Sequence, residues 1–385
     1  VFIVFLIFHF TTNSFSESQD PVRGKNGMVV SASELASKVG VEILKKGGNA
    51  VDAAVAVGFA LAVTHPSAGN IGGGGFMVIH LNNGTNTTID YREKAPASAN
   101  EFIFQDSLGN FLPDKSQSGV TSSGVPGSVA GLIYALEKYG SLSLAEVLQP
   151  AIDLARNGFE LQYRLAKSLA YELEYFNQYE SSKKVFTKDG IPFNEGELLI
   201  QKDLANTLEL IKQRGAAGFY SGKTAELIVN QIKQLGGFIT LDDLSNYKPV
   251  ERIPITTDYR GYKVITMGPP SGGGVTLLQM LNILENYSFT KEEWGSSNYI
   301  HKLVETMKYS FADRSKHIGD PDFYNVPIEW LLSKKYAKEI FNKITDVAVP
   351  SSEILPGVAN SYLESEETTH YSVVDKFGNS VSTTT

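Results

Sequence analysis

The chain has 385 residues, with 34 Lys or Arg and 42 Asp or Glu, giving a formal net charge of -8. This length suits one large domain or two lobes and excludes a small scaffold that needs cross-links to fold. The acidic balance, without a dense Lys/Arg block, argues against a nucleic-acid-binding surface and favours a small-molecule partner. Cysteine is absent, which excludes disulfides, thiolate metal sites and a cysteine nucleophile.

The first residues form a short apolar stretch. Residues 1–16 run from Val1 through several Phe and Ile side chains to small residues near Ser16, as in a secretory signal. The stretch is shorter than the roughly 20 apolar residues that a membrane-spanning helix needs, and no later segment is long enough either. We therefore predict a signal-peptide-like segment over residues 1–16, no stable membrane span, and a secreted or periplasmic location. An N-terminal strand or an uncleaved anchor is the alternative for this segment.

The following segment predicts one strand and two helices. Gly27–Val30 has the apolar character of a buried strand, and Ser31 or Ser33 is placed to cap a helix over residues 35–44. Asn49 is placed to cap a second helix over residues 50–63. That helix is apolar nearly all round, which predicts a central position in the core.

A glycine run then precedes a predicted hairpin. The strands are residues 76–81 and 87–92, joined by a turn at Asn83-Gly84. The run Gly72-Gly73-Gly74-Gly75 lacks the Lys-Ser/Thr pair of a phosphate-binding loop. It is explained either by close approach of two backbones, which glycine permits, or by a role as a wall of a site.

The remainder is helical and then returns to strands. Helical spacing over residues 128–235 predicts a helix-rich lobe, with strands expected at residues 253–257 and 262–267 and a final hairpin at residues 369–375 and 380–385. The other helices are expected at residues 129–139, 143–157, 161–175, 204–214, 275–284 and 297–313. Because the sequence stops within the last strand, we expect that strand to form an open edge and the natural protein to continue.

Thr368 is the candidate nucleophile. It opens the strand-like run Thr368-Thr369-His370-Tyr371, directly after Glu367. A threonine hydroxyl needs a base beside it, and cleavage of the Glu367–Thr368 bond would supply the α-amino group of Thr368 as that base. The alternative is an ordinary strand, since these residue types favour strands.

His370 is two residues beyond Thr368. Alternate strand residues share a face, so His370 is a possible supporting residue for Thr368, with a structural histidine as the alternative. The six histidines show no metal-ligand spacing, and we predict neither a metal nor a cofactor.

Arg92 stands where a predicted strand opens into a loop. Its planar guanidinium suits a carboxylate ligand, because two parallel charge-assisted hydrogen bonds fix the ligand's orientation. An internal ion pair with Asp90 or Glu93 is the alternative.

Several motifs, taken in order, closely resemble the large subunit of the γ-glutamyltransferases from about Gly24 to the last residue. The motifs are Asn49-Ala50-Val51-Asp52-Ala53-Ala54, Asn70-Ile71-Gly72-Gly73-Gly74-Gly75-Phe76, Asp90-Tyr91-Arg92-Glu93-Lys94-Ala95-Pro96, Gly124-Val125-Pro126-Gly127-Ser128-Val129-Ala130-Gly131, Met307-Lys308-Tyr309-Ser310-Phe311-Ala312-Asp313-Arg314, Gly319-Asp320-Pro321-Asp322-Phe323 and Thr368-Thr369-His370-Tyr371-Ser372-Val373-Val374-Asp375. Each motif is weak alone, but the ordered set is specific.

The resemblance implies an α/β (α+β) fold, the αββα sandwich of N-terminal-nucleophile hydrolases. It implies a zymogen that cleaves itself at Glu367–Thr368, with residues 17–367 as the large subunit, including a helix-rich lobe, and residues 368–385 as the truncated start of the small subunit. By the same resemblance Thr368 acts in both cleavage and catalysis, Arg92 binds the α-carboxylate of the γ-glutamyl group, and Glu93 supports Arg92.

The implied activity is γ-glutamyl transfer and glutathione hydrolysis without a cofactor. The partners would be glutathione and other γ-glutamyl compounds, amino-acid or dipeptide acceptors, and the chain's own small subunit. Because the family's oxyanion-hole glycines lie in that subunit, we expect the present 385 residues alone to be inactive. The alternatives are a related N-terminal-nucleophile β-lactam acylase, which would not need Arg92, and a non-catalytic secreted scaffold of the same fold.

Overall fold

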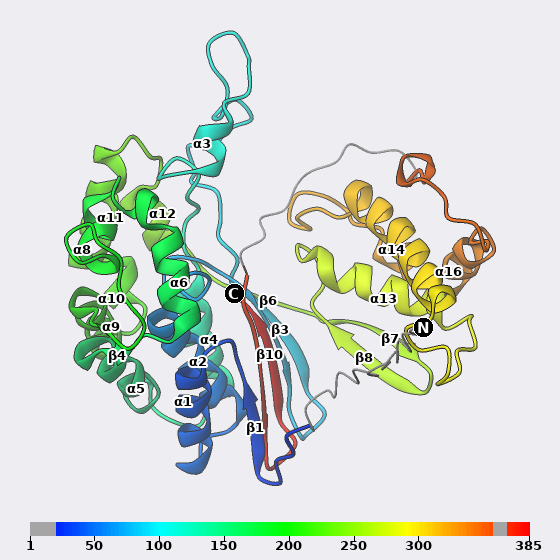
Figure 1. Cartoon of the computed structure of the whole chain (residues 1–385), viewed down its shortest axis with the longest axis horizontal. Helices are drawn as coiled ribbons and strands as arrows, with labels where there is room; N and C mark the ends of the chain where they lie inside the picture. The colour runs from blue at the N-terminus through cyan, green and yellow to red at the C-terminus, as the bar shows by residue number, and fades with distance from the viewer. Residues whose placement is uncertain (1–20, 357–367) are drawn as a thin grey trace, which may run out of the picture.

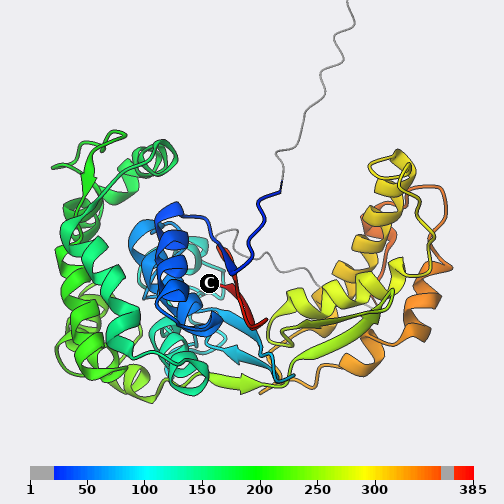
Figure 2. The ribbon, with the colours of Figure 1, turned by 90° about the horizontal axis from the view of Figure 1, so that it is seen from below.

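Three parts follow one another across the molecule, namely a helical body, a central sheet and a second lobe (Figures 1 and 2). The computed structural model describes residues 21–356 and 368–385, so the predicted signal segment 1–16 lies outside the described residues. Glu367 lies outside them as well, and the predicted division into subunits at residues 367 and 368 therefore stays a prediction.

The central sheet has six strands, and each strand is antiparallel to its neighbours. Their order is β1 (Gly27–Val30), β9 (His370–Asp375), β10 (Ser380–Thr384), β2 (Phe76–His80), β3 (Asn86–Asp90) and β6 (Val250–Arg252). Strand β10 lies between β9 and β2, so the expectation of an open edge at the end of the sequence is wrong. The reason is that β2, from a distant part of the chain, pairs with the side of β10 that β9 leaves free.

Helix α2 (Ala50–Thr64) is the centre of the core, and all of its residues are buried. Its N-terminus is fixed from two sides. Asn49 and Asp52 form a capping box, and the Ala50 N–H donates to Asp375 Oδ2 of the hairpin at 3.0 Å. Helix α1 (Glu34–Lys45), capped by Ser33, packs on α2, and α2 packs on β9 and β10. The predicted strand Gly27–Val30 and both predicted helices are confirmed.

The helical body covers one face of the sheet (Figure 1). Its elements are α4 (Ser128–Tyr139), α5 (Leu144–Asn157), α6 (Tyr163–Tyr171), α7 (Leu173–Phe176), α8 (Glu180–Phe186), α9 (Lys202–Arg214), α10 (Ala217–Tyr220), α11 (Gly222–Gln234), α12 (Leu241–Asn246) and the short pair β4 (Phe159–Glu160) and β5 (Leu198–Leu199), while α3 (Pro113–Gln117) stands on a projecting loop. The predicted helix over residues 161–175 divides at Glu172, because α7 buries no side chain that would continue the packed face of α6.

The second lobe was not separated from the rest by the sequence. It contains the antiparallel strands β7 (Ile255–Tyr259) and β8 (Tyr262–Thr266), α13 (Gly272–Leu284), α14 (Ser297–His317), α15 (Ile328–Leu331), α16 (Lys334–Phe341) and the 3-10 turn Ser351–Glu353. These elements pack chiefly on one another around two small apolar clusters. The chain enters the lobe directly from β6.

The sheet face opposite the helical body is open in the described residues. Along β9, Tyr371 and Val373 are buried toward α2, while His370 and Val374 are exposed on the other face. The neighbouring Val30 of β1 is also exposed. No helix within residues 21–356 and 368–385 is both long enough and apolar enough to span a bilayer.

Candidate functional site

Thr368 precedes β9 at one end of the central sheet, where its side chain is exposed. The next residue, Thr369, is fixed, because its N–H donates to the Thr385 carbonyl at 2.9 Å and its carbonyl accepts the Thr385 N–H at 3.0 Å. The Thr385 hydroxyl in turn donates to the Gly74 carbonyl at 2.8 Å, just before β2. The ladder thus extends right up to the candidate nucleophile.

Arg92 leaves the sheet at the same end. Gly75 and Tyr91 exchange backbone hydrogen bonds of 3.3 and 3.0 Å, which extend the β2–β3 ladder to the residue before Arg92. The strands carrying Thr368 and Arg92 are three steps apart in the sheet, so about 14 Å separates their backbones at roughly 4.8 Å per strand. The sequence-predicted nucleophile Thr368 and cation Arg92 therefore lie at the same end of the sheet.

The glycine run sits between these two strands. A Cβ on Gly74 would lie 2.6 Å from the Tyr91 carbonyl oxygen, and one on Gly75 would lie 2.4 Å from the Thr384 carbonyl oxygen. Gly73 accepts the N–H groups of Gly127 and Ser128 at 2.7 and 3.0 Å. Close backbone approach is confirmed as the reason for Gly74 and Gly75, whereas Gly72 has no neighbour of this kind among the described residues and lines a cavity.

A cavity of about 660 Å³ lies between this end of the sheet and the second lobe. Cationic and anionic side chains both line it. The lining residues are Asp90, Arg92, Glu93, Lys94, Arg252, Pro270, Gly272, Phe311, Arg314, Ser315, Ile318, Gly319, Asp320 and Asp322. Its mixed charge suits a small zwitterionic ligand more than an apolar one.

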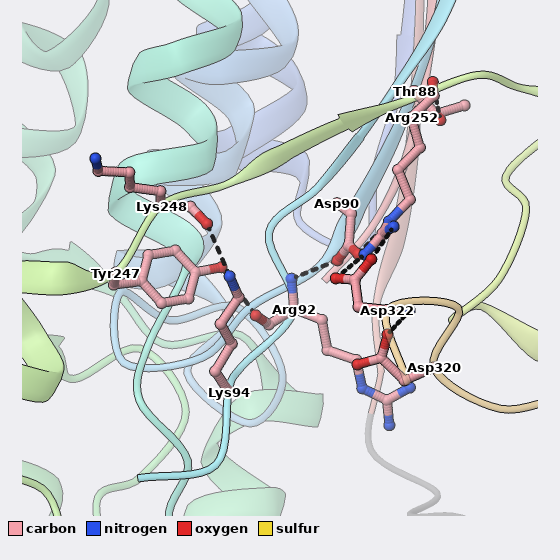
Figure 3. Close-up of polar contacts among 9 residues, drawn as sticks. All are labelled: Thr88, Asp90, Arg92, Lys94, Tyr247, Lys248, Arg252, Asp320 and Asp322. Carbon is pink, nitrogen blue, oxygen red and sulfur yellow. Dashed lines mark hydrogen bonds and ion pairs between the residues drawn. The ribbon is translucent and has the colours of Figure 1, made fainter. Parts of the chain in front are cut away.

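Arg92 is held by its backbone and not by its side chain. Its N–H donates to Asp90 Oδ1 at 3.2 Å, and its carbonyl accepts the Tyr247 hydroxyl at 2.8 Å (Figure 3). Within the described residues its exposed guanidinium forms no ion pair with Asp90 or Glu93. The arrangement favours a guanidinium that is available to a ligand over the internal ion pair.

Arg252 is the residue that sequence reasoning missed. Its Nε donates to Asp90 Oδ2 at 2.8 Å, and its two terminal nitrogens donate to the two oxygens of Asp322 at 3.0 Å each (Figure 3). The hydrogen bonds that Arg252 donates to Asp322, acting against partial burial, raise the pKa of Arg252, and the same hydrogen bonds lower the pKa of Asp322. The only sequence signal was indirect, since both acids belong to motifs of the resemblance.

Glu93 follows Arg92 and is exposed, lining both the large cavity and a smaller adjoining one. The next residue, Lys94, exchanges backbone hydrogen bonds with Val125, and its ammonium lies 5.3 Å from the centre of the Tyr247 ring. Support of Arg92 by Glu93 stays a prediction.

His370 lies on the open face of the sheet among hydroxyl groups. Its Nδ1 is 3.0 Å from Thr384 Oγ1, and its Nε2 is 3.1 Å from Ser382 Oγ and 3.3 Å from Ser372 Oγ. Burial lowers the pKa of His370, which favours the neutral ring. These contacts fit a satisfied structural histidine, and a role beside Thr368 stays a prediction.

Within residues 21–356 and 368–385, no group of three or more His, Asp or Glu side chains is placed to hold a metal ion.

Comparisons with known proteins agree on one family. The family model of gamma-glutamyltranspeptidase matches residues 36–385. The glutathione hydrolase proenzyme of Escherichia coli is 52% identical over 366 residues, which cover 94% of this chain and 63% of that protein. The glutathione hydrolase proenzyme of Bacillus subtilis strain 168 is 41% identical over 97% of this chain and 66% of that protein. This chain therefore spans a little under two thirds of the length of these curated relatives.

Solved structures show the same relationship. The crystal structure of Helicobacter pylori gamma-glutamyltranspeptidase superposes with a TM-score of 0.86 at 48% identity, covering 90% of this chain and all of that chain. A cephalosporin acylase from Bacillus halodurans superposes with a TM-score of 0.83 at 28% identity, covering 98% of this chain and 68% of that one. These neighbours confirm the predicted N-terminal-nucleophile hydrolase fold class. The chain belongs to the gamma-glutamyltranspeptidase family.

Proposed function

We propose that this chain is the major part of a γ-glutamyltransferase and glutathione hydrolase that matures by cleavage between Glu367 and Thr368. The observation that carries the proposal is the placement of Thr368 and Arg92 at one end of the sheet, beside a charged cavity. Relatives named glutathione hydrolase proenzyme, up to 52% identical, support both the activity and the maturation.

Maturation would begin when the Thr368 hydroxyl attacks the Glu367 carbonyl carbon. The peptide C–N bond breaks, the acyl group passes to the hydroxyl oxygen as an ester, and the nitrogen becomes the free α-amine of Thr368. Water then hydrolyses the ester, releasing the Glu367 carboxylate. The product carries a hydroxyl and a basic amine on one residue, which is the arrangement that activates a threonine nucleophile.

Turnover would then proceed through a covalent intermediate. The amine of Thr368 accepts the hydroxyl proton while the oxygen attacks the γ-amide carbonyl of glutathione, and the same proton is delivered to the leaving amine of cysteinylglycine. The resulting γ-glutamyl ester is broken by water, giving glutamate, or by the amine of an amino acid or dipeptide, giving a new γ-glutamyl amide. Both outcomes share one intermediate, which predicts ping-pong kinetics.

Arg92 would hold the donor during both steps. About 14 Å between the two backbones leaves room for an extended γ-glutamyl group between the Arg92 guanidinium and the Thr368 hydroxyl. The guanidinium would form paired hydrogen bonds with the α-carboxylate, and Glu93 would support it.

The partner of the open sheet face would be the chain's own small subunit. Val30 and Val374 expose apolar surface on this face, where a second sheet of an αββα sandwich would pack about 10 Å away. A secreted or periplasmic location follows from the signal-like residues 1–16 and is tested by fractionation with N-terminal sequencing of the mature protein.

Replacement of the nucleophile tests the proposed function. In the full-length protein, Thr368→Ala should abolish both chain cleavage and release of the anilide from a γ-glutamyl anilide, while Thr368→Ser, which keeps a hydroxyl, should retain cleavage at a reduced rate. Cleavage or turnover that persists in Thr368→Ala would show that another group is the nucleophile.

The second candidate is a β-lactam acylase of the same fold. It has support from an Acylase ACY 1 proenzyme of Pseudomonas sp. strain V22, 38% identical over 96% of this chain, and from the cephalosporin acylase structure. The available guanidinium of Arg92 favours the γ-glutamyl donor. Comparing hydrolysis of a γ-glutamyl anilide with hydrolysis of a β-lactam side-chain amide decides between them.

A further inference from the structure

Arg252 joins the central sheet to the second lobe. Its side chain is 15% exposed and lies between Asp90 of β3, 8% exposed, and Asp322 of the second lobe, 52% exposed. One guanidinium therefore serves two carboxylates, at 2.8 Å through Nε and at 3.0 Å through each terminal nitrogen. We call these three residues the Arg252 clasp.

On the sheet side, the clasp reaches the donor-binding cation. Asp90 uses Oδ2 for Arg252 and Oδ1 for the backbone N–H of Arg92, at 3.2 Å (Figure 3). A shift of Asp90 would therefore move the point from which the Arg92 side chain starts.

On the lobe side, the clasp reaches the opposite wall of the cavity. The Asp322 N–H donates to Asp320 Oδ1 at 3.0 Å, and the Tyr324 N–H donates to the Asp320 carbonyl at 2.8 Å, so this turn is closed on itself. Asp320 lines the same cavity as Arg92. The clasp thus connects two walls that face each other.

Among residues 21–356 and 368–385, the helices and strands of the second lobe make few contacts with the central sheet. They pack chiefly on one another, and the chain enters the lobe immediately after Arg252 through Ile253, which is 90% exposed. An exposed connection of this kind permits movement about residues 253 and 254. A bidentate Arg–carboxylate pair across the connection restricts that movement, because both hydrogen bonds must keep their geometry.

We infer that Arg252 is a positioning residue that sets the width of the cavity, and hence the fit of the γ-glutamyl donor, by clasping Asp90 and Asp322 at once. The inference rests on the proposed function for the identity of the ligand. Arginine is required because its fork presents donors to two carboxylates, whereas a lysine ammonium is a single point charge.

If the clasp were only a structural ion pair, its loss would change the stability of the protein and leave the Michaelis constant of the donor unchanged. Asp322 is half exposed, and pairs with such exposure contribute little to the free energy of unfolding. Loss of the clasp should therefore change the Michaelis constant of the donor more than the melting temperature.

The kinetic test uses Asp322→Asn in the full-length protein with a γ-glutamyl anilide as donor. We expect KM to rise about 3- to 10-fold, with kcat within about twofold of the parent and a melting temperature nearly unchanged. Asp322→Glu, which keeps the carboxylate, should recover most of the donor affinity. The matched control is Glu285→Gln, which breaks an ion pair with Lys334 inside the same lobe and should leave KM unchanged.

A second measurement does not depend on activity. The 385 residues contain no cysteine, so spin labels are introduced with Glu226→Cys on α11 and Lys263→Cys on β8, both exposed positions. Pulsed electron spin resonance should give a broader or shifted distance distribution when Asp322→Asn is added, and an unchanged distribution with Glu285→Gln.

The outcomes separate the two proposals. A parent protein that cleaves no γ-glutamyl donor contradicts the proposed function, and the spin-label distances then decide the clasp alone. An active parent with the same KM and the same distances in Asp322→Asn overturns the inference about Arg252, while the proposed function stands. A rise in KM that Glu285→Gln reproduces would also overturn it, because any loss of a lobe ion pair would then suffice.

Discussion

At the scale of single residues, the candidate site depends on how Arg92 is anchored. Its backbone N–H and carbonyl are both bound, by Asp90 and by Tyr247, while its guanidinium is left to the cavity. The anchored backbone fixes the point from which the Arg92 side chain extends, so binding of a ligand does not have to order the backbone as well.

Replacing Arg92 should weaken donor binding selectively. We expect Arg92→Lys to raise KM for glutathione on the order of 10-fold and Arg92→Ala on the order of 100-fold, because charge-assisted hydrogen bonds to the α-carboxylate are lost. Steady-state kinetics of glutathione hydrolysis measures this, with Arg156→Lys, in an exposed pair with Glu209, as the control. An unchanged KM in Arg92→Ala would remove the main support for a γ-glutamyl donor.

Removing the Tyr247 hydroxyl should have a smaller effect of the same kind. The hydroxyl donates to the Arg92 carbonyl at 2.8 Å, and the ring lies parallel to that of Tyr220 with centroids 5.8 Å apart. Tyr247→Phe keeps the stacking and loses the hydrogen bond, so we expect a loss of about 1 kcal/mol in unfolding free energy and a several-fold rise in KM. Tyr163→Phe, at an exposed ring, is the control, and equal KM values in Tyr247→Phe and the parent would contradict anchoring by Tyr247.

At the scale of elements, the glycine run shows why a sequence pattern needed the structure for its explanation. The run predicted either close packing or a site wall, and the distances from Gly74 and Gly75 to neighbouring backbone atoms confirm close packing at the edge that carries Arg92. The close approach of these strands also serves the candidate site, because it brings Thr368 and Arg92 to the same end of the sheet.

Two alanine substitutions within the run should differ sharply. In Gly74→Ala the new methyl group would lie 2.6 Å from backbone atoms of Tyr91 and Glu93, so we expect a loss of about 1–3 kcal/mol in unfolding free energy. In Gly72→Ala the nearest neighbour of the new methyl group would be a side-chain oxygen of Asn70 at 3.8 Å, and stability should be nearly unchanged. Thermal unfolding of both variants measures this, and equal melting temperatures would contradict the packing explanation.

Glu251 of β6 is bound to the helical body by hydrogen bonds whose contribution to stability should depend on pH. It accepts hydrogen bonds from Thr87, Tyr134, Tyr139 and Lys138. Partial burial acts to raise the pKa of Glu251, but these hydrogen bonds outweigh it and lower the pKa to about 2. Because the folded pKa is below the unfolded value, this contribution to stability is present above about pH 4.5 and is lost as pH falls toward about 2.

The substitution Glu251→Gln tests the contribution of these hydrogen bonds. We expect the variant to be less stable than the parent by roughly 1–2 kcal/mol at pH 7, and the difference to shrink between about pH 4.5 and pH 2 as the parent becomes protonated. Melting temperatures measured across this pH range check the prediction, with Glu42→Gln, in an exposed pair with Lys45, as the control. A difference that stays constant with pH would assign the loss to packing and not to charge.

At the scale of the whole molecule, the sequence predicted the local elements better than their arrangement. Helix α2, the two hairpins of the sheet and most helices of the body followed from periodicity, caps and turns, because those signals are local. The strands and the two long helices of the second lobe were predicted, but its separation from the rest of the molecule and the role of Arg252 were missed. The strand β6 is only three residues long, and the clasp joins residues separated by 162 and 70 positions. Pairing over such separations leaves no periodic trace in the sequence.

The same distinction applies to the candidate site. Thr368 and Arg92 were identified from residue type and resemblance. Their position at the same end of the sheet depends on β10 lying between β9 and β2. The curved arrangement in Figure 2 then places the second lobe beyond that end, with the cavity between them. This end of the sheet and the second lobe thus form the two sides of the candidate donor site.

The most direct test of the central claim is the intact mass of the purified full-length protein, combined with N-terminal sequencing of its products. We expect two polypeptides, one of which begins at Thr368, and γ-glutamyl anilide turnover that appears together with this cleavage. A single polypeptide in which Glu367 is still joined to Thr368, and which turns over the γ-glutamyl anilide at the full rate, would contradict the claim.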